Sequence, residues 1–287
     1  MTDKNMQNGL SMVELLVALA LSSILILGVT QIYIDNKRSY SFQVSQGHNQ
    51  ENSRYAEYLI SGWLNKAGYR RTPEQLVEDA FPALSASADC EAFARGAVVA
   101  AFKGSTGEKG LCFRYQPVNE NEQDCQGNTV KAVSGTRLNI PFMQSAEDEV
   151  VVSVLKFVPD NELHRGSLQC KNLTATTPAF VELIDGIADV HLEYALGEGD
   201  LFEKRIKETS PWVVTPPTAL SGGLVRAVRY SVLLASAANR RDGDTAILDS
   251  WIADVASTAD KTRIENNDRR RIYQQVSSVI SLRNMMP

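Results

Sequence analysis

The chain has 287 residues, of which 44% are hydrophobic and 22% are charged, a balance typical of a globular protein and unlike a disordered or low-complexity one. Its formal net charge is -5 at pH 7, which gives no electrostatic case for binding nucleic acid or an anionic membrane surface. The short basic runs at 70–71, 240–241 and 269–271 are expected to be solvated or paired with carboxylates.

An uncharged run from 15 to 34, mostly Leu, Val, Ile and Ala, is the first predicted element. A helix of this length covers the roughly 30 Å hydrocarbon core of a bilayer. A cleaved signal peptide is a weaker interpretation, because the Ala18-Leu19-Ala20 sequence lies inside the run instead of after a short apolar core. A buried helix of a soluble protein would need a large core around an N-terminal segment. We therefore predict a retained membrane helix.

Glu14 stands immediately before this run, where an ionised carboxylate at bilayer depth costs a few kcal/mol. No cationic residue lies within one helical turn of it. If the chain were cut after Gly9, a new α-amino group would appear on Leu10, one turn away. That amine, from the same or a neighbouring copy, could neutralise the carboxylate, and the helix dipole favours an acid in the first turn.

The helix is predicted to continue well beyond the membrane, because no proline occurs before Pro73 and the sequence up to Gly68 is compatible with a helix throughout. We expect one helix from Leu10 to Gly68, with its second half packed on a globular domain. Gly68 is the expected stop. The predicted packing stripe consists of Tyr55, Leu59, Trp63 and Ala67, widened by Tyr58 and Leu64.

From Ala97 onward, short β-rich runs alternate with turn residues. A hairpin connection is expected between Phe157 and Glu162, where Pro159 precedes Asp160 and Asn161. The predicted class is α+β, with an antiparallel sheet packed on the long helix. The runs are at 96–104, 110–118, 136–143, 149–158, 162–170, 189–196 and 224–236.

At the N-terminus, a short polar segment (MTDKNMQN) is followed by Gly9, an apolar residue, Ser11, two apolar residues, Glu14 and the hydrophobic run. This order resembles the class III prepilin leader of type IV pilins and type II secretion pseudopilins. The resemblance implies that a prepilin peptidase cuts between Gly9 and Leu10 and methylates the Leu10 amine. The first mature residue, usually Phe, is Leu here, and the leader is less basic than most because Asp3 stands beside Lys4.

Six later motifs follow in order: FRYQ at 113–116, DCQGN at 124–128, LQC at 168–170, FVELIDGIADVHLEYAL at 180–196, VRAVRYSVLLAS at 225–236 and RRIYQQVSSVISLRN at 270–284. This order is similar to that of the PilW family of minor type IV pilins, which are relatives of the J pseudopilin of type II secretion. The resemblance implies a type IV pilin fold with four segments. They are a leader at 1–9, a membrane or filament-core helix at 10–34, an amphipathic continuation at 35–68 and a periplasmic α+β domain at 69–287.

The resemblance also implies location and partners. The protein would be a single-pass inner-membrane precursor with a cytoplasmic N-terminus, which then enters a pilus at or near its tip. Expected partners are the major pilin, other minor pilins, prepilin peptidase, the inner-membrane assembly platform and a tip adhesin. Two alternatives stay open: a pseudopilin of type II secretion, and a membrane-anchored periplasmic enzyme or binding module.

Four cysteines would then lie in an oxidising compartment, where an even number favours two disulfides over one bridge plus free thiols. Three pairings are possible from the residues alone. Resemblance to the family's cysteine arrangement favours Cys125 with Cys170, which leaves Cys90 with Cys112. A zinc site is not expected, since no pair has C-x2-4-C spacing.

Catalytic signals are weak, and we predict no enzyme and no cofactor. His48, His164 and His191 lie far apart in the sequence, and no G-x-S-x-G motif is present. The glycines of GSTGEKG at 104–110 fit a turn better than a phosphate loop. A calcium loop could use Asp242, Asp244 and Asp249, but their order falls short of an EF-hand and a solvated loop is favoured.

Overall fold

A computed structural model of the chain defines the fold. The residues that it describes are 11–119, 121–130, 149–198, 206–207, 212–239 and 241–285. The expected run at 136–143 lies outside them.

The helix α1 (Met12–Lys66) is 55 residues long and dominates the N-terminal part of the molecule. Ser11 is its N-cap, with an extended backbone at φ -66° and ψ 140°. Beyond the C-cap Ala67, Gly68 has a φ of +73°, the left-handed conformation in which glycine commonly ends a helix. A single long helix with Gly68 as its stop is therefore confirmed, although its first residue lies two positions after the predicted start and its last residue, Lys66, lies two positions before the predicted end.

The buried stripe of α1 differs from the predicted one. Tyr55 and Tyr58 are 48% and 72% exposed, so their prediction as packing residues is wrong. Leu64 and Ala67 are buried as expected, and Leu59 and Trp63 pack against the edge of the core. The buried positions within the helix recur every three or four residues: Ser45, Asn49, Ser53, Ala56, Ile60 and Leu64.

Small side chains explain the altered stripe. Strands β8 (Val225–Asn239) and β9 (Arg271–Ser281) contact α1 directly. Ser45, Ser53 and Ala56 let the helix approach these strands closely. Asn49 Nδ2 donates a hydrogen bond to Ile272 O of β9 (2.9 Å), which anchors the helix beside the strand. Periodicity of large apolar residues cannot detect such a contact, because the residues that make it are small or polar.

The described residues of the globular domain form two antiparallel sheets, where one sheet had been predicted. The first has the order β1-β2-β3-β4-β5 and the second β7-β6-β8-β9. The strands of the first are β1 (Val99–Ala101), β2 (Lys109–Tyr115), β3 (Val151–Val158), β4 (Ser167–Asn172) and β5 (Val181–Ile184). Those of the second are β6 (Ile187–Leu196), β7 (Trp212–Val213), β8 (Val225–Asn239) and β9 (Arg271–Ser281).

The predicted hairpin between β3 and β4 is present but longer than expected. Val158 pairs with Ser167, so the loop extends past Glu162 and the strand expected from 162 begins only at Ser167. Asp160 Oδ1 accepts a hydrogen bond from Glu162 N (2.7 Å), the local turn contact that its sequence favours.

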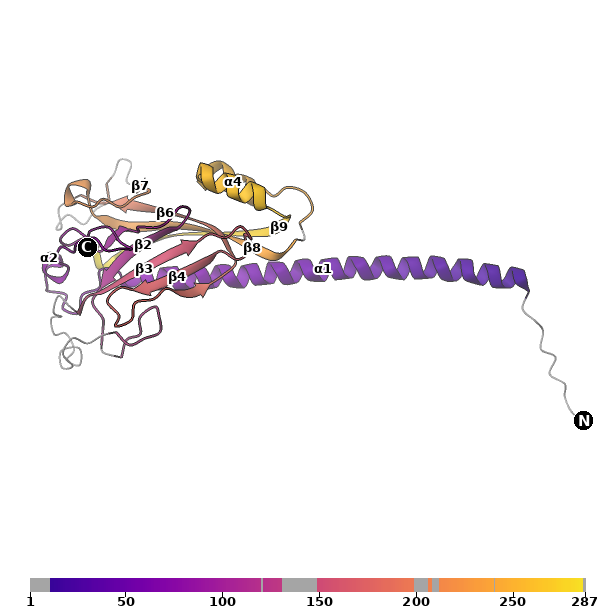
Figure 1. Ribbon diagram of the computed structural model, residues 1–287, viewed down its shortest axis with the longest axis horizontal. Helices are drawn as coiled ribbons and strands as arrows, with labels where there is room; N and C mark the ends of the chain where they lie inside the picture. The colour runs from indigo at the N-terminus through magenta and orange to yellow at the C-terminus, as the bar shows by residue number, and fades with distance from the viewer. Residues whose placement is uncertain are drawn as a thin grey trace, which may run out of the picture.

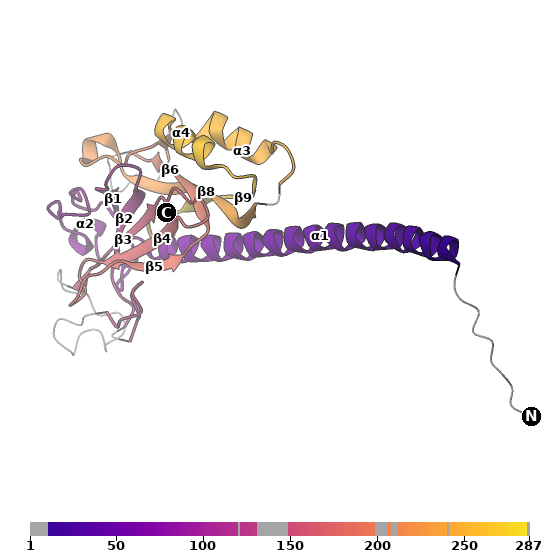
Figure 2. The same cartoon turned by 45° about the vertical axis from the view of Figure 1, so that its right-hand side comes forward.

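Short helices complete the domain. The segment between β8 and β9 forms a small lobe of α3 (Ala246–Ser250), a π-helical turn (Trp251–Val255) and α4 (Thr258–Asn267). Elsewhere there are α2 (Val77–Ala80) and 3-10 turns at Leu220–Gly222 and Arg283–Met285. The front half of α1 projects far out from the globular domain, while its back half lies against the sheets (Figure 1; Figure 2).

Candidate functional site

The projecting half of α1 carries the residues that the sequence singled out. In its first turn, the Ser11 side chain accepts a hydrogen bond from Val13 N (3.4 Å), and Ser11 N donates to Glu14 Oε2 (3.2 Å). This pair is a capping box, in which two otherwise unpaired backbone donors are satisfied reciprocally. Glu14 therefore lies in the first turn, as predicted. Gly9 and Leu10, the predicted processing residues, lie outside the described residues.

The helix surface from Met12 to Tyr40 is exposed on every side. Within the described part of the chain, α1 is the one helix long and apolar enough to cross a membrane by length and composition. Its large exposed apolar side chains up to residue 34 are Met12, Val13, Leu15, Leu16, Val17, Leu19, Leu21, Ile24, Leu25, Ile26, Leu27, Val29, Ile32, Tyr33 and Ile34. So much apolar surface is stable only when lipid or other protein covers it.

Polar side chains within this surface bond to the helix itself. Ser22 Oγ donates to Ala18 O (2.7 Å), and Ser23 Oγ donates to Ala20 O (2.8 Å). Thr30 Oγ1 donates to Ile26 O (2.7 Å) in the same way. These three hydroxyls therefore need no water and are compatible with a hydrocarbon environment.

A second group of charged residues, missed by the sequence reasoning, joins the two sheets to the α3–α4 lobe. Lys109 Nζ of β2 lies 2.7 Å from Asp189 Oδ1 of β6 and 2.8 Å from Asp260 Oδ2 of α4. Arg263 lies 3.5 Å and 3.6 Å from the same two carboxylates. Trp251 Nε1 donates to Asp189 Oδ2 (2.9 Å). Because both aspartates are almost fully buried, the network stabilises the domain only while its partners remain in place.

The ionisation of Asp260 depends on this network. Burial alone would raise the pKa of Asp260, but hydrogen bonds from Lys109 and Ser257, with the charges of Lys109 and Arg263, outweigh it. They hold the pKa of Asp260 below its ordinary value. A sequence pattern could have flagged only Asp189, an acid in a β-rich run.

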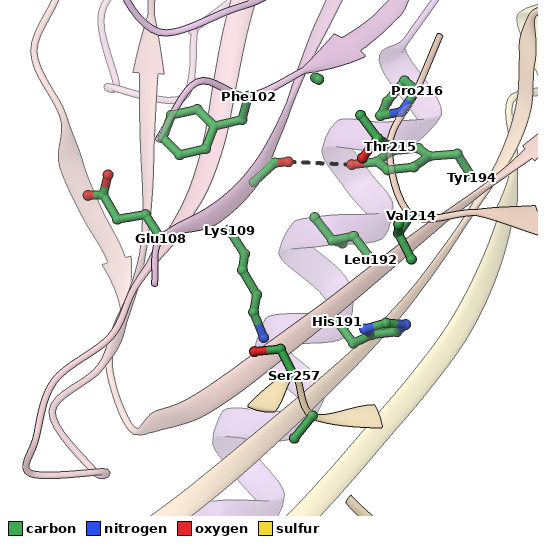
Figure 3. Close-up of a pocket in the computed structure, with 13 residues that line it drawn as sticks. Phe102, Glu108, Lys109, His191, Leu192, Tyr194, Val214, Thr215, Pro216 and Ser257 are labelled. Atoms are coloured by element: carbon green, nitrogen blue, oxygen red, sulfur yellow. Dashed lines mark hydrogen bonds between the residues drawn. The ribbon is translucent and has the colours of Figure 1, made fainter. Parts of the chain in front are cut away.

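A pocket of about 460 Å³ lies next to the network. Figure 3 shows Lys109 pointing toward Ser257, with His191 nearby and Phe102 and Pro216 farther along the pocket. Tyr194 Oη donates to Gly110 O (3.4 Å), shown as the dashed line. Lys109 is the one lysine or arginine among the described residues that line the pocket, and it is already paired with two carboxylates.

The histidines do not form a shared site. His48 is exposed on α1, His191 lines the pocket on β6, and His164 lies in the hairpin loop near Glu162 (3.7 Å). Burial lowers the pKa of both His191 and His164, so the neutral imidazole is favoured in each.

Residues 104–108 of GSTGEKG lie in the β1–β2 connection, as the glycines predicted, and Lys109 and Gly110 begin β2. Glu108 Oε2 accepts a hydrogen bond from Ser105 N (2.8 Å), which closes the turn on itself, and Gly107 has a φ of +86°. The amide of Ser105 is therefore used within the turn.

The aspartates of the calcium candidate are described by the structure. Among the residues that the structure describes, no three His, Cys, Asp or Glu side chains are grouped as metal ligands. Asp242, Asp244 and Asp249 belong to this described part, and all three are exposed.

Two disulfides join Cys90 to Cys112 and Cys125 to Cys170, the pairing that the resemblance implied. Cys112 lies on β2 and Cys170 on β4, so each bridge ties a loop to the first sheet. Beside the second bridge, Asp124 Oδ2 accepts a hydrogen bond from Asn172 Nδ2 (2.8 Å). The bridges therefore fix the loops around 90 and 125 against the sheet.

Comparison with known proteins shows similarity both in sequence and in structure. A family model described as the prokaryotic N-terminal methylation motif matches residues 4–30, which confirms the predicted leader. A solved type IV-like pilin from Thermus thermophilus is 11% identical, with a TM-score of 0.42, and the match covers 83% of this chain and 97% of that one. No curated protein sequence matches the chain.

Proposed function

We propose that this protein is a minor pilin, trimmed after Gly9 and methylated on Leu10, that helps to initiate or prime assembly of a type IV pilus. It is a structural component and works by packing and charge pairing. Its segments would be the leader at 1–9, the filament-core helix at 10–34, the amphipathic continuation at 35–68 and the periplasmic domain at 69–287.

The observation that carries this proposal is the division of α1. Residues 12–34 expose apolar side chains on all sides, whereas every buried position of the helix lies between Ser45 and Leu64. The N-terminal half of this continuous helix is therefore suited to a nonaqueous environment, and its C-terminal half packs on the globular domain. Together with the methylation motif at 4–30, this favours a subunit that moves from a membrane into a helical bundle.

Glu14 would set the axial register between subunits. Its carboxylate sits among exposed apolar residues in the first turn, so assembly would bury it in an apolar bundle. A buried charge without a partner costs several kcal/mol, by order of magnitude. Pairing with the Leu10 amine of a neighbouring subunit would remove this penalty only at the correct axial position.

The proposed location follows from the leader. Before assembly, the protein would span the inner membrane once, with residues 1–9 in the cytoplasm and the disulfide-bonded domain in the periplasm. Prepilin peptidase would act on the cytoplasmic side. The assembly platform, the major pilin and other minor pilins would be the later partners, with the protein in a complex at the pilus tip that could carry an adhesin.

The N-terminal residue and mass of the mature protein test the processing step. We expect a chain that begins with methylated Leu10, and a Gly9→Val variant that remains at precursor length. A wild-type protein that keeps Met1 to Gly9 while pili assemble normally would contradict the proposal.

A separate test addresses Glu14. We expect Glu14→Gln to be processed but poorly incorporated into filaments, because the variant keeps side-chain size and loses charge. Recovery of the variant in sheared pili at the wild-type level would refute the register role.

Leader and helix would serve a type II secretion pseudopilus equally well. Co-purification of the crosslinked protein with pilus subunits is expected under our proposal. Recovery with secretion components alone would assign it to the pseudopilus.

A further inference from the structure

The second sheet ends in a long edge strand. In the order β7-β6-β8-β9, strand β9 pairs with β8 on one side and with no described strand on the other. It has 11 residues, whereas the described edge strands β1, β5 and β7 have three, four and two residues. A strand edge of this length presents a row of backbone N–H and C=O groups with which another strand can pair.

The pairing with β8 identifies the residues of β9 whose backbone groups point away from the sheet. Leu282 N donates to Arg226 O (2.8 Å), and bonded and non-bonded residue pairs alternate along an antiparallel ladder. From residue 274 on, the even-numbered residues are therefore bonded to β8, and the odd-numbered ones direct N–H and C=O outward. Outside the pairing with β8, the described residues supply no backbone partner for these outward groups. The outward residues all have exposed side chains: Gln275, Ser277, Val279 and Ser281.

This edge also lacks the features that keep exposed strand edges from pairing. From Ile272 to Ser281 the sequence contains no charged residue and no proline. The register shift that interrupts the β8–β9 pairing lies between Ala235 and Asn239, beside the first residues of β9. Natural edge strands are usually blocked by a lysine, a proline or a bulge. The part of β9 that follows Tyr273 is therefore open to pairing.

Side chains beside the edge specify the chemistry of a partner strand. On the face toward α1, Val276 and Ile280 are only partly buried and pack against the margin of the core. On the opposite face, Val279 is 50% exposed. Side chains that face each other on paired strands lie about 4.5–5.5 Å apart, so aliphatic residues of an added strand would cover all three. A charged residue there would lose water without gaining a partner. The edge therefore fits an uncharged strand with aliphatic side chains.

A second copy of this chain does not fit the edge in the orientation that a membrane imposes. Strand β9 runs alongside α1: Asn49 bonds to Ile272 O at one end (2.9 Å). At the other end, Asn284 Nδ2 donates to Ala67 O (3.1 Å). Two β9 strands paired antiparallel would therefore point their α1 helices in opposite directions, and both apolar halves could not enter one membrane from the same side. Parallel pairing of the two edges is the weaker arrangement.

We infer that the free edge of β9 binds an extended, uncharged strand of another subunit of the pilus complex, which adds to the four-stranded second sheet. This inference rests on the proposed function, because the shared membrane orientation selects the partner. Affinity would come from main-chain hydrogen bonds to the outward residues. Selectivity would come from aliphatic contacts with Val276, Val279 and Ile280.

A peptide that can pair on one side only tests the edge directly. The probe is a short acetylated and amidated peptide of alternating valine and threonine, in which every second amide is N-methylated so that it cannot form fibrils. The full chain in detergent should bind it, and hydrogen exchange of the Ser277 and Val279 amides should slow about tenfold or more. A peptide with every amide N-methylated should have no effect. Unchanged exchange of both amides with the one-sided peptide would overturn the inference.

A proline on the edge provides the matching variant. Ser277→Pro removes one outward N–H but none of the bonds to β8, and proline is tolerated at such edge positions. It should weaken peptide binding about tenfold, the effect of losing one hydrogen bond of the upper typical strength. Ser277→Ala is the control, because it also loses the hydroxyl contact with Ser231 Oγ (2.8 Å) but keeps the N–H. Equal binding by the two variants would contradict strand addition.

A second substitution keeps the test valid if Ser277→Pro does not fold. Val279→Lys places a charge beside the free edge, where natural edge strands use lysine to prevent pairing. It should lower the affinity for the peptide, whereas Val279→Thr should bind like wild type. Equal affinities of the lysine and threonine variants would refute pairing at this edge.

Recovery in sheared pili separates this inference from the proposed function. Wild type and Ser277→Ala should be recovered equally, and Ser277→Pro should be depleted about tenfold, although all three are trimmed after Gly9. Absence of the wild-type chain from pili would refute the proposed function, whichever way the peptide experiment turns out. If the wild-type chain is present and the proline variant is recovered equally well, only the inference about β9 fails. A dimer of the purified chain that Ser277→Pro dissolves would assign the edge to a second copy and also overturn it.

Discussion

Asp260 remains ionised at a buried position because three polar groups face it. Lys109, Arg263 and Ser257 all lie within reach of its carboxylate, and Lys109 also holds Asp189 on the second sheet. Removing one member of such a network leaves the others buried with unbalanced charge. Removing one member should therefore lower the free energy of unfolding by more than the removal of a surface ion pair would.

Asp260→Asn should lower the free energy of unfolding by about 3 kcal/mol at pH 7. Because the folded state lowers the pKa of Asp260, the ionised form stabilises the domain above the unfolded pKa of 3.8. This stabilisation is lost as the pH falls through the lower folded value, so the difference from wild type should narrow toward pH 3. Urea unfolding of the full chain in detergent at several pH values measures it.

Asp249→Asn is the matched control, since Asp249 is exposed on the neighbouring helix α3. Its effect should stay within about 0.5 kcal/mol. An equal decrease in the free energy of unfolding for Asp260→Asn and Asp249→Asn would contradict the stabilising role of the buried network.

His191 carries a positive charge when protonated, whereas Asp260 carries a negative charge when deprotonated. Both groups nevertheless make the folded domain less stable as the pH falls. Burial lowers the pKa of His191 in the folded state, and the charge of Lys109 adds to this effect against that of Glu193. The neutral form is therefore favoured on folding, and stability should fall as the pH drops below the unfolded value of 6.5.

His191→Gln should make the free energy of unfolding less dependent on pH between 7.5 and 5.5, as measured by urea unfolding. Adding His164→Gln should flatten the dependence further, because burial lowers that pKa as well. If the free energy of unfolding of the double variant depended on pH as steeply as that of wild type, neither histidine would be the source of the pH dependence.

At the scale of elements, α1 has two chemically different faces along its second half. The face on β8 and β9 is lined mainly by small residues, while Tyr55 and Tyr58 remain exposed. The length of the helix and its end at Gly68 were predictable, because glycine and the absence of proline act locally. The face that packs was not, because it depends on how closely a distant sheet approaches.

Ala56→Phe should destabilise the domain by about 1–3 kcal/mol, because Ala56 is fully buried and its neighbours leave no room for a ring. Tyr58→Ala, on the exposed side of the same helix, is the control and should change stability by less than about 0.5 kcal/mol. Thermal unfolding of both variants compares them. A larger loss of stability for Tyr58→Ala than for Ala56→Phe would mean that the face of α1 with Tyr58 packs on the domain, as the sequence predicted.

At the scale of the whole molecule, the globular domain and the projecting helix are energetically separate. All side chains from 12 to 36 are exposed, so the domain makes no buried contact through them. Two sheets, the back half of α1 and the C-terminal residues share one continuous core instead.

A chain that begins at Lys37 should therefore fold cooperatively, with a Tm within a few degrees of the full chain. Without the apolar half of α1, it should also be monomeric in the absence of detergent. Circular dichroism and sedimentation velocity check the two expectations. Loss of cooperative unfolding would mean that the projecting half supports the fold.

The sequence alone determined the local and one-dimensional features of this protein. The leader motif, the apolar run, the helix end at Gly68 and the turn at GSTGEKG each depend on neighbouring residues, and short-range physics is encoded in short-range patterns.

Only the tertiary structure decided that the strands divide into two sheets, that the face with Ser53 and Ala56 meets them, and that Lys109 joins Asp189 to Asp260. These features bring together residues far apart in the chain. Their free energy comes from close approach and desolvation, which no periodicity in the sequence records.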